Sequence, residues 1–369
     1  MVVAPGVYDG ISARMAERSP FRAMYMSGYM VAASRYGLPD AGIIGMNDMV
    51  DALRTIRGCT TKPIICDADT GYGGLVNVQH TVRGYESAGA SALHIEDQEM
   101  PKKCGHTKGK RVVPVADMVA KVEVAASSRR SEEFLIIART DSLASEGFER
   151  AMARLQAYRE AGADIVFMDA PTTVEPMRAV AAAFPRQSMI NIVPYRHFMT
   201  PEVSVAALAN MGFAIAIFPG VMSFPSIGSM ERSLAKLAND EPADFISSQI
   251  SPHEPMGFPQ VWADEQRWGS ATAAPPPRPF DRRPTAGKGS ATAASGPGSI
   301  DAFNMRGRIR DRVGIRIRPG QYISLAGVER GDLPQRQSGK PPKTWRHAQE
   351  CPACPLHQNH PAAASLPGE

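Results

Sequence analysis

The stretch that decides the fold is residues 76–97, VNVQHTVRGYESAGASALHIED. Its first part, residues 76–87, carries apolar side chains at helical spacing, and residues 92–96 form a short apolar run that ends in a charged residue. Strands that are buried on both faces of a parallel sheet have this continuous apolar character. Gly89 stands between the two, where the end of a helix often requires a positive φ angle. The stretch therefore predicts a helix that leads into a buried parallel strand.

The same pattern recurs along the chain, with glycine joints at Ala161-Gly162-Ala163 and Met211-Gly212-Phe213. Further helices are predicted at residues 46–57, 114–127, 148–160 and 201–210. Strands are predicted at residues 2–4, 23–27, 63–67, 92–96, 134–139, 164–168, 188–193 and 213–218. This alternation is typical of the α/β class and predicts a (β/α)8 barrel of the TIM type. An open doubly wound sheet would need a G-x-G-x-x-G turn after its first strand, and residues 5–10, PGVYDG, lack one.

Composition separates a barrel domain, residues 1–268, from a tail, residues 269–369. The chain has 369 residues, and 43% of them are hydrophobic, which is enough for a large core. The net charge of +4 combines a net of −4 in the first part with +8 in the tail, which also holds 14 of the 31 prolines. A segment of this kind buries little apolar surface, so we expect the tail to be largely disordered.

Several classes of protein are disfavoured by the sequence. No run of apolar residues is long enough to span a membrane, and the N-terminus lacks the blocks of a secretory signal. The five cysteines are scattered, which is typical of a reduced compartment, so we expect a cytoplasmic protein, with a mitochondrial location as the alternative. The mildly acidic body disfavours nucleic-acid binding, and the tail has no aromatic residues interleaved with its arginines for stacking on bases.

Two features of the tail stand apart. Residues 309–325 alternate apolar and basic side chains as an exposed strand does. A cluster of cysteines and histidines follows nearer the end, at Cys351, Cys354, His357 and His360. Zinc sites usually have a longer loop between the two ligand pairs, so chance composition is the favoured interpretation of this cluster.

Acidic residues gather at the predicted strand ends, where a barrel of this type places its chemistry. Asp67 and Asp69 follow one strand, Glu96 ends the next, and Asp40 lies in an earlier loop. Four converging carboxylates need a counter-charge, and all-oxygen ligands favour a hard cation. We therefore expect a metal site for Mg²⁺, with Mn²⁺ as the alternative. The competing interpretation is that these acids cap helices and pair with lysines.

Arg139 and the loop at residues 100–110, MPKKCGHTKGK, complete the candidate site. An arginine at a strand end offers a bidentate fork to a carboxylate, or forms an ion pair with Asp141 or Glu96. Lysines precede Cys104, and positive neighbours lower the pKa of a thiol, so we expect this thiol to exchange protons near neutral pH. The glycines and lysines suit a lid over an anionic ligand. Cys59 and Cys66 lie in apolar surroundings and are expected to be structural.

These residues together resemble the isocitrate lyase and phosphoenolpyruvate mutase superfamily, over roughly residues 1–268. The matching motifs are Pro5-Gly6-Val7-Tyr8-Asp9, Tyr25-Met26-Ser27-Gly28, Leu38-Pro39-Asp40, Asp67-Ala68-Asp69-Thr70-Gly71-Tyr72-Gly73, His94-Ile95-Glu96-Asp97-Gln98, Lys102-Lys103-Cys104-Gly105-His106 and Ala138-Arg139-Thr140-Asp141. The resemblance implies a barrel with Mg²⁺, assembled as a homotetramer or homodimer in which helix eight is exchanged between subunits. The motif around Cys104 is the most specific part of the match.

The resemblance also implies roles for individual residues. Asp67 is similar to the direct Mg²⁺ ligand, with Asp40, Asp69 and Glu96 acting mostly through water, and Cys104 resembles the catalytic acid/base of the carbon–carbon lyases. The candidate catalytic residues are Cys104, Arg139, Glu96, His94 and Lys103. The candidate substrate-binding residues are Ser27, Gly28, Asp40, Gly105, His106, Arg139 and Asn191.

The implied function is a Mg²⁺-dependent carbon–carbon bond lyase or hydrolase that acts on a small 2-hydroxy or 2-oxo dicarboxylate through an enolate-like intermediate. Methylisocitrate, dimethylmalate and oxaloacetate represent this substrate type. Residues 218–224, FPGVMSF, lack an arginine that methylisocitrate lyases use there, and Asp169 stands where lyases often have glutamate, so a smaller substrate is favoured. The alternatives are a phosphoenolpyruvate or carboxyphosphonoenolpyruvate phosphonomutase, disfavoured by Cys104, and an inactive barrel whose basic tail binds RNA or protein.

Overall fold

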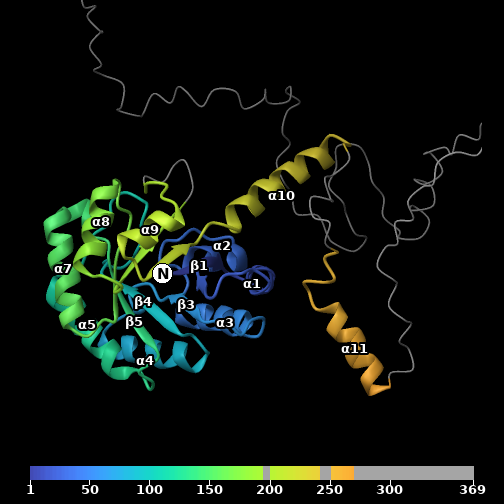
Figure 1. The fold of residues 1–369 in the computed structure, drawn as a ribbon, viewed down its shortest axis with the longest axis horizontal. Coiled ribbons are helices and arrows are strands. Elements are labelled where there is room, and N and C mark those ends of the chain that lie inside the picture. Colours follow the sequence, from blue (N-terminus) through green and yellow to red (C-terminus); the bar gives the residue numbers. More distant parts are fainter. Residues whose placement is uncertain (194–199, 242–250, 270–369) are drawn as a thin grey trace, which may run out of the picture. The chain divides into compact units, whose positions relative to one another are not determined.

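The fold is a closed parallel barrel, described here from a computed structural model that covers residues 1–193, 200–241 and 251–269 (Figure 1). The strands follow one another around the barrel in chain order, each parallel to its neighbours, and β1 pairs with β8 to close it. They are β1 (Val2–Val7), β2 (Met24–Met26), β3 (Ile64–Asp67), β4 (Ala92–Glu96), β5 (Leu135–Thr140), β6 (Ile165–Met168), β7 (Ser188–Asn191) and β8 (Ile215–Phe218). The prediction of a (β/α)8 barrel is therefore confirmed.

Helices connect the strands and cover the outside of the barrel. They are α1 (Gly10–Glu17), α2 (Gly28–Tyr36), α3 (Met46–Arg57), α4 (Leu75–Ser87), α5 (Val115–Ser128), α6 (Leu143–Glu146), α7 (Phe148–Glu160), α8 (Val174–Ala183) and α9 (Val205–Met211), followed after β8 by α10 (Ser223–Ala238) and α11 (Phe258–Trp268). No helix in the described part of the chain is both long enough and apolar enough to cross a membrane. The predicted tail lies almost wholly outside the described residues, as do its strand-like island and its Cys/His cluster.

Glycine ends the helices that were used to predict the fold. Gly89, Gly162 and Gly212 all have positive φ angles, between 92° and 106°, directly before β4, β6 and β8. Only glycine adopts such angles without steric cost, so these joints reverse the chain from helix to strand as expected. The first strand is longer than predicted, since it runs past Ala4 to Val7. Gly6 pairs with Tyr25 of β2, and a Cβ atom there would collide with the backbone of Pro219.

The core has two layers, one between strands and helices and one inside the barrel. The outer layer packs side chains such as Leu53, Val82 and Leu155 against the strands. The inner layer fills the barrel with residues that include Tyr25, Ile137, Phe167, Met189 and Ile217. The barrel is thus a packed core and not a pore, as is usual for this architecture.

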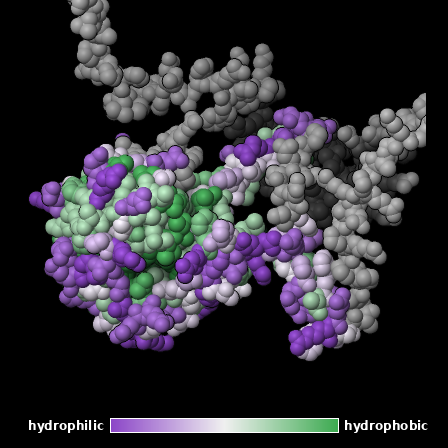
Figure 2. All heavy atoms as spheres, viewed as in Figure 1, coloured by the Kyte–Doolittle hydropathy of each residue, from purple (hydrophilic) through white to green (hydrophobic). Residues whose placement is uncertain are grey.

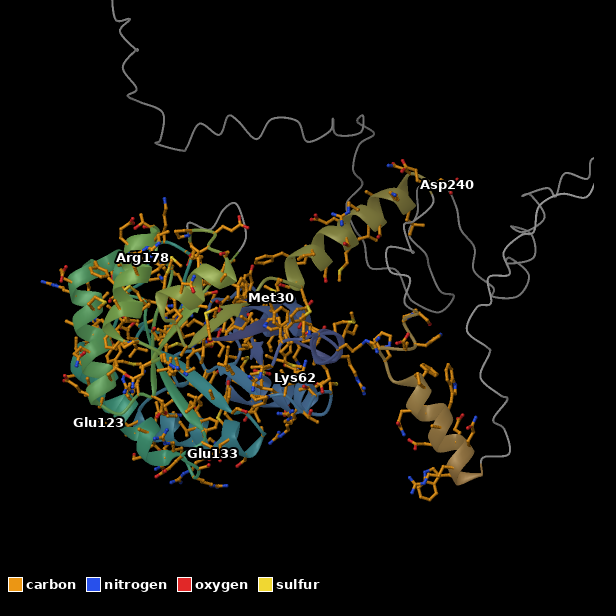
Figure 3. The ribbon with its side chains drawn as sticks, in the orientation of Figure 1. Met30, Lys62, Glu123, Glu133, Arg178 and Asp240 are labelled. Carbon is orange, nitrogen blue, oxygen red and sulfur yellow. The ribbon has the colours of Figure 1, made fainter. Side chains whose placement is uncertain are left out.

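Polar residues cover the outside of the barrel helices. Glu123 on α5 and Arg178 on α8 are exposed and point outward (Figure 3). On the face seen in Figure 2, hydrophilic residues occupy much of the rim, and hydrophobic residues gather nearer its centre. The chemistry of the molecule must therefore be sought where the strands end, because the inside is filled with apolar groups.

Candidate active site

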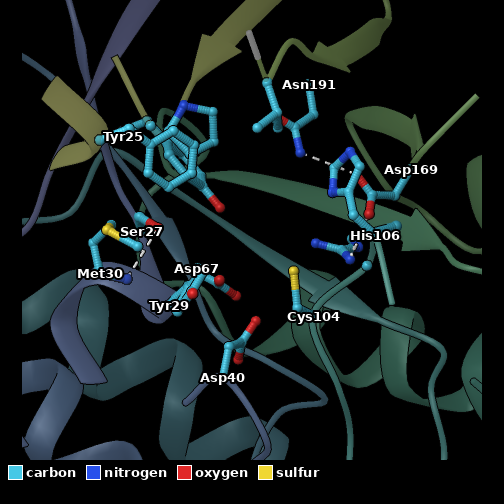
Figure 4. A pocket seen from close by; sticks show the side chains of 16 residues that line it. Tyr25, Ser27, Tyr29, Met30, Asp40, Asp67, Cys104, His106, Asp169 and Asn191 are labelled. Carbon is cyan, nitrogen blue, oxygen red and sulfur yellow. Dashed lines mark hydrogen bonds and ion pairs between the residues drawn. The ribbon is translucent and has the colours of Figure 1, made fainter. Parts of the chain in front are cut away.

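Polar side chains from several strand ends meet around one small cavity (Figure 4). Asp67 ends β3, Arg139 lies near the end of β5, and Asp169 follows β6. Cys104 comes from the loop between β4 and α5 and points its sulfur toward the same space. The cavity has a volume of about 60 Å³ and is lined by Tyr25, Ser27, Tyr29, Met30, Asp40, Asp67, Cys104, Gly105, His106, Arg139, Asp169, Asn191, Val193, Pro219, Gly220 and Phe224.

Most of the candidate site residues lie on this wall or directly behind it. Asp69, Glu96 and His94 are buried behind the wall, and the backbone N–H of Gly28 donates to Asp67 Oδ2 at 3.2 Å. Lys103 is the exception. Its side chain is exposed, and its Nζ lies near Gly109 at the outer part of the loop. The structure therefore does not bring Lys103 into the cavity.

Lys102, the neighbour of Lys103, is the lysine that turns inward. It is 3% exposed, and its Nζ lies 2.5 Å from Asp40 Oδ1 and 2.6 Å from Asp69 Oδ1. Burial would lower the pKa of this lysine, but the surrounding carboxylates, led by Asp69 and Glu96, raise it well above its ordinary value. Lys102 is therefore an ammonium ion that neutralises part of the acidic cluster, defined here as Asp40, Asp67, Asp69 and Glu96.

The carboxyl groups of this cluster differ in their ionisation. Burial opposes the charge of Asp67, but His94 and Lys102 outweigh it and hold the pKa of Asp67 below its usual value. Burial raises the pKa of Asp69 to about 6, although Lys102 opposes the rise. Burial also raises the pKa of Glu96 well above its ordinary value. The raised pKa values of Asp69 and Glu96 reflect the cost of burying several negative charges together, which a cation at this place would lower.

The acidic cluster offers oxygen donors to a divalent cation, but they are not arranged as a preformed cage. Among the described residues, no three His, Cys, Asp or Glu side chains converge as a preformed metal cage, since Lys102 lies between Asp40 and Asp69. Glu96 Oε2, however, is buried and accepts no hydrogen bond from any described residue. This oxygen lies 3.3 Å from Arg139 Nε but accepts no hydrogen bond, and a buried carboxyl oxygen with spare acceptor capacity, in a set of oxygen donors, fits a hard cation such as Mg²⁺. The donor set is compatible with the predicted metal.

His94 lies behind Asp67 and makes mostly aromatic contacts. Its Nε2 is 2.9 Å from the hydroxyl of Tyr25, its ring stacks on that of Tyr25, and its edge meets Phe167. Nε2 is 3.7 Å from Asp67 Oδ1. Burial lowers the pKa of His94 to about 4, so the imidazole is neutral at physiological pH. In this position it supports Asp67 and does not line the cavity.

Arg139 forms the predicted ion pairs and also faces the cavity, where it can bind a ligand carboxylate. Its Nε and Nη2 contact Asp141 at 2.7 and 3.0 Å, Nη2 also contacts Asp169 at 2.8 Å, and Glu96 is 3.3 Å away. Its Nη1 makes no hydrogen bond to any described residue, while the guanidinium lines the cavity. The ion pairs therefore orient the arginine and leave one donor group for a ligand.

A buried polar network behind β4 and β5 fixes the partner of Arg139. Asp97 accepts hydrogen bonds from Thr140 Oγ1 at 2.7 Å, from the backbone N–H of Asp141 at 2.9 Å and from the hydroxyl of Tyr158 at 2.8 Å. Arg154 lies 3.4 Å from the same carboxylate. Because Asp141 holds Arg139, this network positions the guanidinium from outside the cavity.

The expected low pKa of Cys104 is wrong. Burial raises it to about 11, and the carboxylates of Asp40 and Asp169 add to the rise. The flanking lysines do not offset this effect, since Lys102 is committed to carboxylates and Lys103 points outward. Cys104 is therefore a protonated thiol at neutral pH. It is a better proton donor in this setting than a nucleophile.

The loop that carries Cys104 is tied to the barrel at several points. The backbone N–H of Cys104 donates to the carbonyl of Asp40 at 3.1 Å. Lys110 Nζ contacts Asp141 at 2.7 Å and also donates to the carbonyl of Gly105. His106 Nε2 lies 3.0 Å from Thr200 Oγ1. These contacts hold the loop across the cavity in a closed arrangement.

Sequence reasoning missed Lys102, Lys110 and the Asp97 network as parts of the site. The sequence did contain a signal for two of them. Asp97 follows Glu96 directly at a strand end, and Lys110 lies in the lysine-rich loop that carries Cys104. Nothing in the sequence distinguishes Lys102 from Lys103. Cys66 is buried in the core, in agreement with the structural role expected for it.

Comparison with known proteins agrees with this geometry. A family model described as phosphoenolpyruvate phosphomutase matches residues 1–238. The chain belongs to this family. The resemblance to the phosphoenolpyruvate mutase and isocitrate lyase superfamily is thus confirmed. Among its relatives are the 2,3-dimethylmalate lyase of Eubacterium barkeri, 40% identical over 65% of this chain and 83% of that protein, and the 2-methylisocitrate lyase of Aeropyrum pernix, 41% identical over 64% and 75%.

Solved structures of the same superfamily are similar to this chain. Oxaloacetate acetylhydrolase in complex with 3,3-difluorooxalacetate has a TM-score of 0.69 at 34% identity, and covers 73% of this chain and 92% of its own. Phosphonopyruvate hydrolase, in a complex with oxalate and Mg²⁺, has a TM-score of 0.64 at 28% identity, and covers 73% and 94%. The proteins similar to this chain thus include enzymes named as lyases, an acetylhydrolase and a phosphonopyruvate hydrolase.

Proposed function

We propose that this family member is a carbon–carbon bond lyase or hydrolase that acts on a small 2-hydroxy or 2-oxo dicarboxylate. The observation that carries the proposal is the protonated thiol of Cys104, which shares one small cavity with Arg139 and Asp67. A thiol in this place suits a reaction in which carbon must be protonated after its bond to another carbon breaks. The lyase and hydrolase names among the relatives support the same reaction class.

The substrate would be held by groups on opposite sides of the cavity. Nη1 of Arg139 is a donor for one carboxylate, and Gly105 and His106 lie beside it on the loop. Ser27, whose Oγ accepts from Met30 N at 3.4 Å, begins α2 at the other side of the cavity. We propose that Ser27 and Gly28 bind the other end of the substrate, through its second carboxylate and its oxo or hydroxyl group.

The acidic cluster would hold Mg²⁺, or Mn²⁺, through Asp67 with Asp40, Asp69 and Glu96. Such a cation supplies electrostatic stabilisation of negative charge on the substrate oxygens. Arg139 and the loop residues orient the substrate next to Cys104.

In a 2-hydroxy dicarboxylate, or in the hydrate of a 2-oxo one, a base would remove the proton of a hydroxyl group on C2. A carbonyl group then forms at C2, the C2–C3 bond breaks, and its electron pair passes to the departing fragment as an enolate. Cys104 then donates its Sγ proton to carbon and becomes a thiolate. The closed loop excludes water, which would otherwise protonate the carbanion first.

The remaining walls of the cavity indicate a substrate with small apolar substituents. Met30, Val193 and Phe224 line it, together with Pro219 and Gly220 from the segment after β8. Arg139 is the one lysine or arginine among the described residues of this wall. A third carboxylate would therefore lack a cationic partner. We infer that substituted malates or oxaloacetate are preferred over tricarboxylates such as methylisocitrate.

We also propose that the chain forms a homo-oligomer through α10. Its residues Ile227, Met230, Leu234 and Leu237 are spaced along one helical face and are 48% to 70% exposed. Such a stripe is typical of a helix that packs against another apolar surface. A second copy of the chain is the partner that the resemblance implies, with this helix exchanged between subunits.

The reaction is tested with a panel of dicarboxylates and Mg²⁺, in assays for 2-oxo acids and for oxalate. General acid catalysis contributes roughly 10²- to 10⁴-fold, so Cys104→Ser is expected to lower kcat by that factor. Cys59→Ser is the matched control, because Cys59 is a half-buried cysteine next to α3 that lines no part of the cavity. Its activity should equal that of the unaltered chain.

The same panel includes the competing substrates. Turnover of phosphonopyruvate or phosphoenolpyruvate, without cleavage of any dicarboxylate, would replace the proposal with a phosphonomutase or a phosphonate hydrolase. Equal activity of Cys104→Ser and the unaltered chain on dicarboxylates would remove Cys104 from the mechanism.

A further inference from the structure

The loop between β4 and α5 returns to the barrel next to the point where it leaves. Gln98 pairs with Val112 in an isolated antiparallel bridge, and the N–H of Val113 donates to the carbonyl of Asp97 at 2.8 Å. Residues 99–111 therefore form an excursion whose two ends are joined. The side chain at the root of this excursion is Gln98, which is 2% exposed.

The amide of Gln98 contacts both the excursion and the acidic cluster. Its Nε2 donates to Glu96 Oε1 at 2.9 Å and to the carbonyl of Lys103 at 2.8 Å, and its Oε1 accepts from the N–H of Lys103 at 3.1 Å. A flipped amide would place oxygen against two acceptors, so the pattern defines a single orientation. The buried side chain of Gln98 thus binds the carboxyl group of Glu96 and also the backbone N–H and carbonyl of Lys103, the residue before Cys104.

This contact differs from the other ties that close the loop. Lys102 binds Asp40 and Asp69 through the same carboxyl groups that a divalent cation would use. Gln98 instead takes Oε1 of Glu96 and leaves Oε2, which lies 3.3 Å from Arg139 Nε and accepts no hydrogen bond from the described residues. The tie through Gln98 is therefore compatible with a cation at the cluster, whereas the tie through Lys102 competes with one.

We propose that Gln98 is a positioning residue, whose side-chain amide holds the Cys104 segment closed over the cavity through Lys103 and Glu96 Oε1, and leaves Glu96 Oε2 to face Arg139. The role in catalysis rests on the proposed function, in which Cys104 supplies a proton. The geometric role does not, because it concerns only where the loop lies. Gln98 does not line the cavity, and its side-chain hydrogen bonds go to Lys103 and Glu96.

The test measures the alkylation of individual cysteines by iodoacetamide, followed by peptide mass spectrometry, on the full chain without added metal. Gln98→Met fills the same space but removes three hydrogen bonds. We expect Cys104 in this variant to react roughly tenfold faster or more, because each lost bond favours the open loop. Cys59, in the same molecules, should react at an unchanged rate and reports that the barrel is intact.

Gln156→Met is the matched control. Gln156 also donates to a glutamate, Glu160, at 2.8 Å, but on the exposed face of α7. Its Cys104 should react as in the unaltered chain. An unchanged rate for Cys104 in Gln98→Met, with Cys59 also unchanged, would overturn the proposal.

A second measurement needs no variant, and it decides the outcome if Gln98→Met does not fold. In the unaltered chain, hydrogen exchange at the amide of Lys103 should be slow compared with that of exposed Lys108 in the same loop. Equal exchange at the two positions would show that Gln98 does not hold the loop.

The proposed function can fail separately. If no dicarboxylate is cleaved, the alkylation difference between Gln98→Met and the unaltered chain still reports on positioning. If turnover is found, Gln98→Met should lower kcat more than it changes KM, since the variant alters the placement of Cys104 and not the binding wall.

Discussion

Replacing Gly105 with alanine should keep the loop from closing while the barrel stays folded. An alanine Cβ in this position would lie 2.9 Å from Asp169 Cγ, and closer still to Asp169 Oδ2 and Arg139 Nη2. Asp169 cannot easily yield, because Arg139 holds it at 2.8 Å and Asn191 at 3.2 Å. The loop must therefore move away from the strand ends.

The size of the effect follows from the contacts that the moving loop gives up. The N–H of Cys104 loses the carbonyl of Asp40, and Lys103 loses both of its hydrogen bonds to Gln98. At about 1 kcal/mol for each of three bonds, closure becomes less favourable by roughly 3 kcal/mol, or about a hundredfold. We expect kcat/KM to fall by that factor and the alkylation of Cys104 to become correspondingly faster.

The assay pairs steady-state kinetics with cysteine alkylation and thermal unfolding. Gly74→Ala is the matched control, since Gly74 precedes α4 and no heavy atom lies within 4 Å of a Cβ built there. Both variants should unfold at nearly the temperature of the unaltered chain. If Gly105→Ala protects Cys104 as well as the unaltered chain does, the closed loop does not have the packing described above.

Two further predictions concern acid stability and assembly. His94 has a pKa of about 4 when folded and about 6.5 when unfolded, so the unfolded chain takes up a proton as pH falls between these values and the folded chain does not. The stability that neutral His94 contributes should therefore shrink by roughly 3 kcal/mol from pH 7 to pH 4, measured as the difference in urea unfolding between the unaltered chain and His94→Gln. A constant difference would contradict the buried, neutral imidazole. For assembly, Leu234→Asp should shift the chain toward monomer in analytical ultracentrifugation, whereas Arg232→Asp on the same helix should not. A monomer in the unaltered chain would refute the assignment of this face to a second copy.

The arrangement of helices and strands could be predicted because it depends on local patterns. Buried strands such as residues 134–139 are short and apolar, and glycines such as Gly162 mark positions where a side chain would be strained. Both signals lie within a few residues of the element they describe. The end of the first strand was misplaced because Pro5 and Gly6 are typical of turns. Their pairing depends on other strands, since Gly6 pairs with Tyr25 of β2 and Pro5 with Phe218 of β8.

The composition of the site was less predictable, because it depends on which way a loop faces. Residues 102 and 103 are both lysines, yet only Lys102 enters the acidic cluster. The path of the backbone between Asp40 and the strand ends decides which of the two side chains points inward. The protonation of Cys104 follows from burial, and burial is a property of the closed loop. Sequence neighbours alone indicated the opposite shift. Strand-end residues such as Asp67 and Arg139 were found because the barrel itself carries them to one rim.

The ammonium group of Lys102 affects how the acidic cluster can form while the chain folds. Carboxylates that depended on an external ion for their neutralisation would repel one another during folding until that ion was bound. In this chain the positive charge is that of Lys102, which lies on the same loop that covers the cavity. The cluster can then form in a medium poor in divalent ions. If it binds such an ion, as proposed above, binding would be an exchange in which the ammonium of Lys102 gives way to the ion.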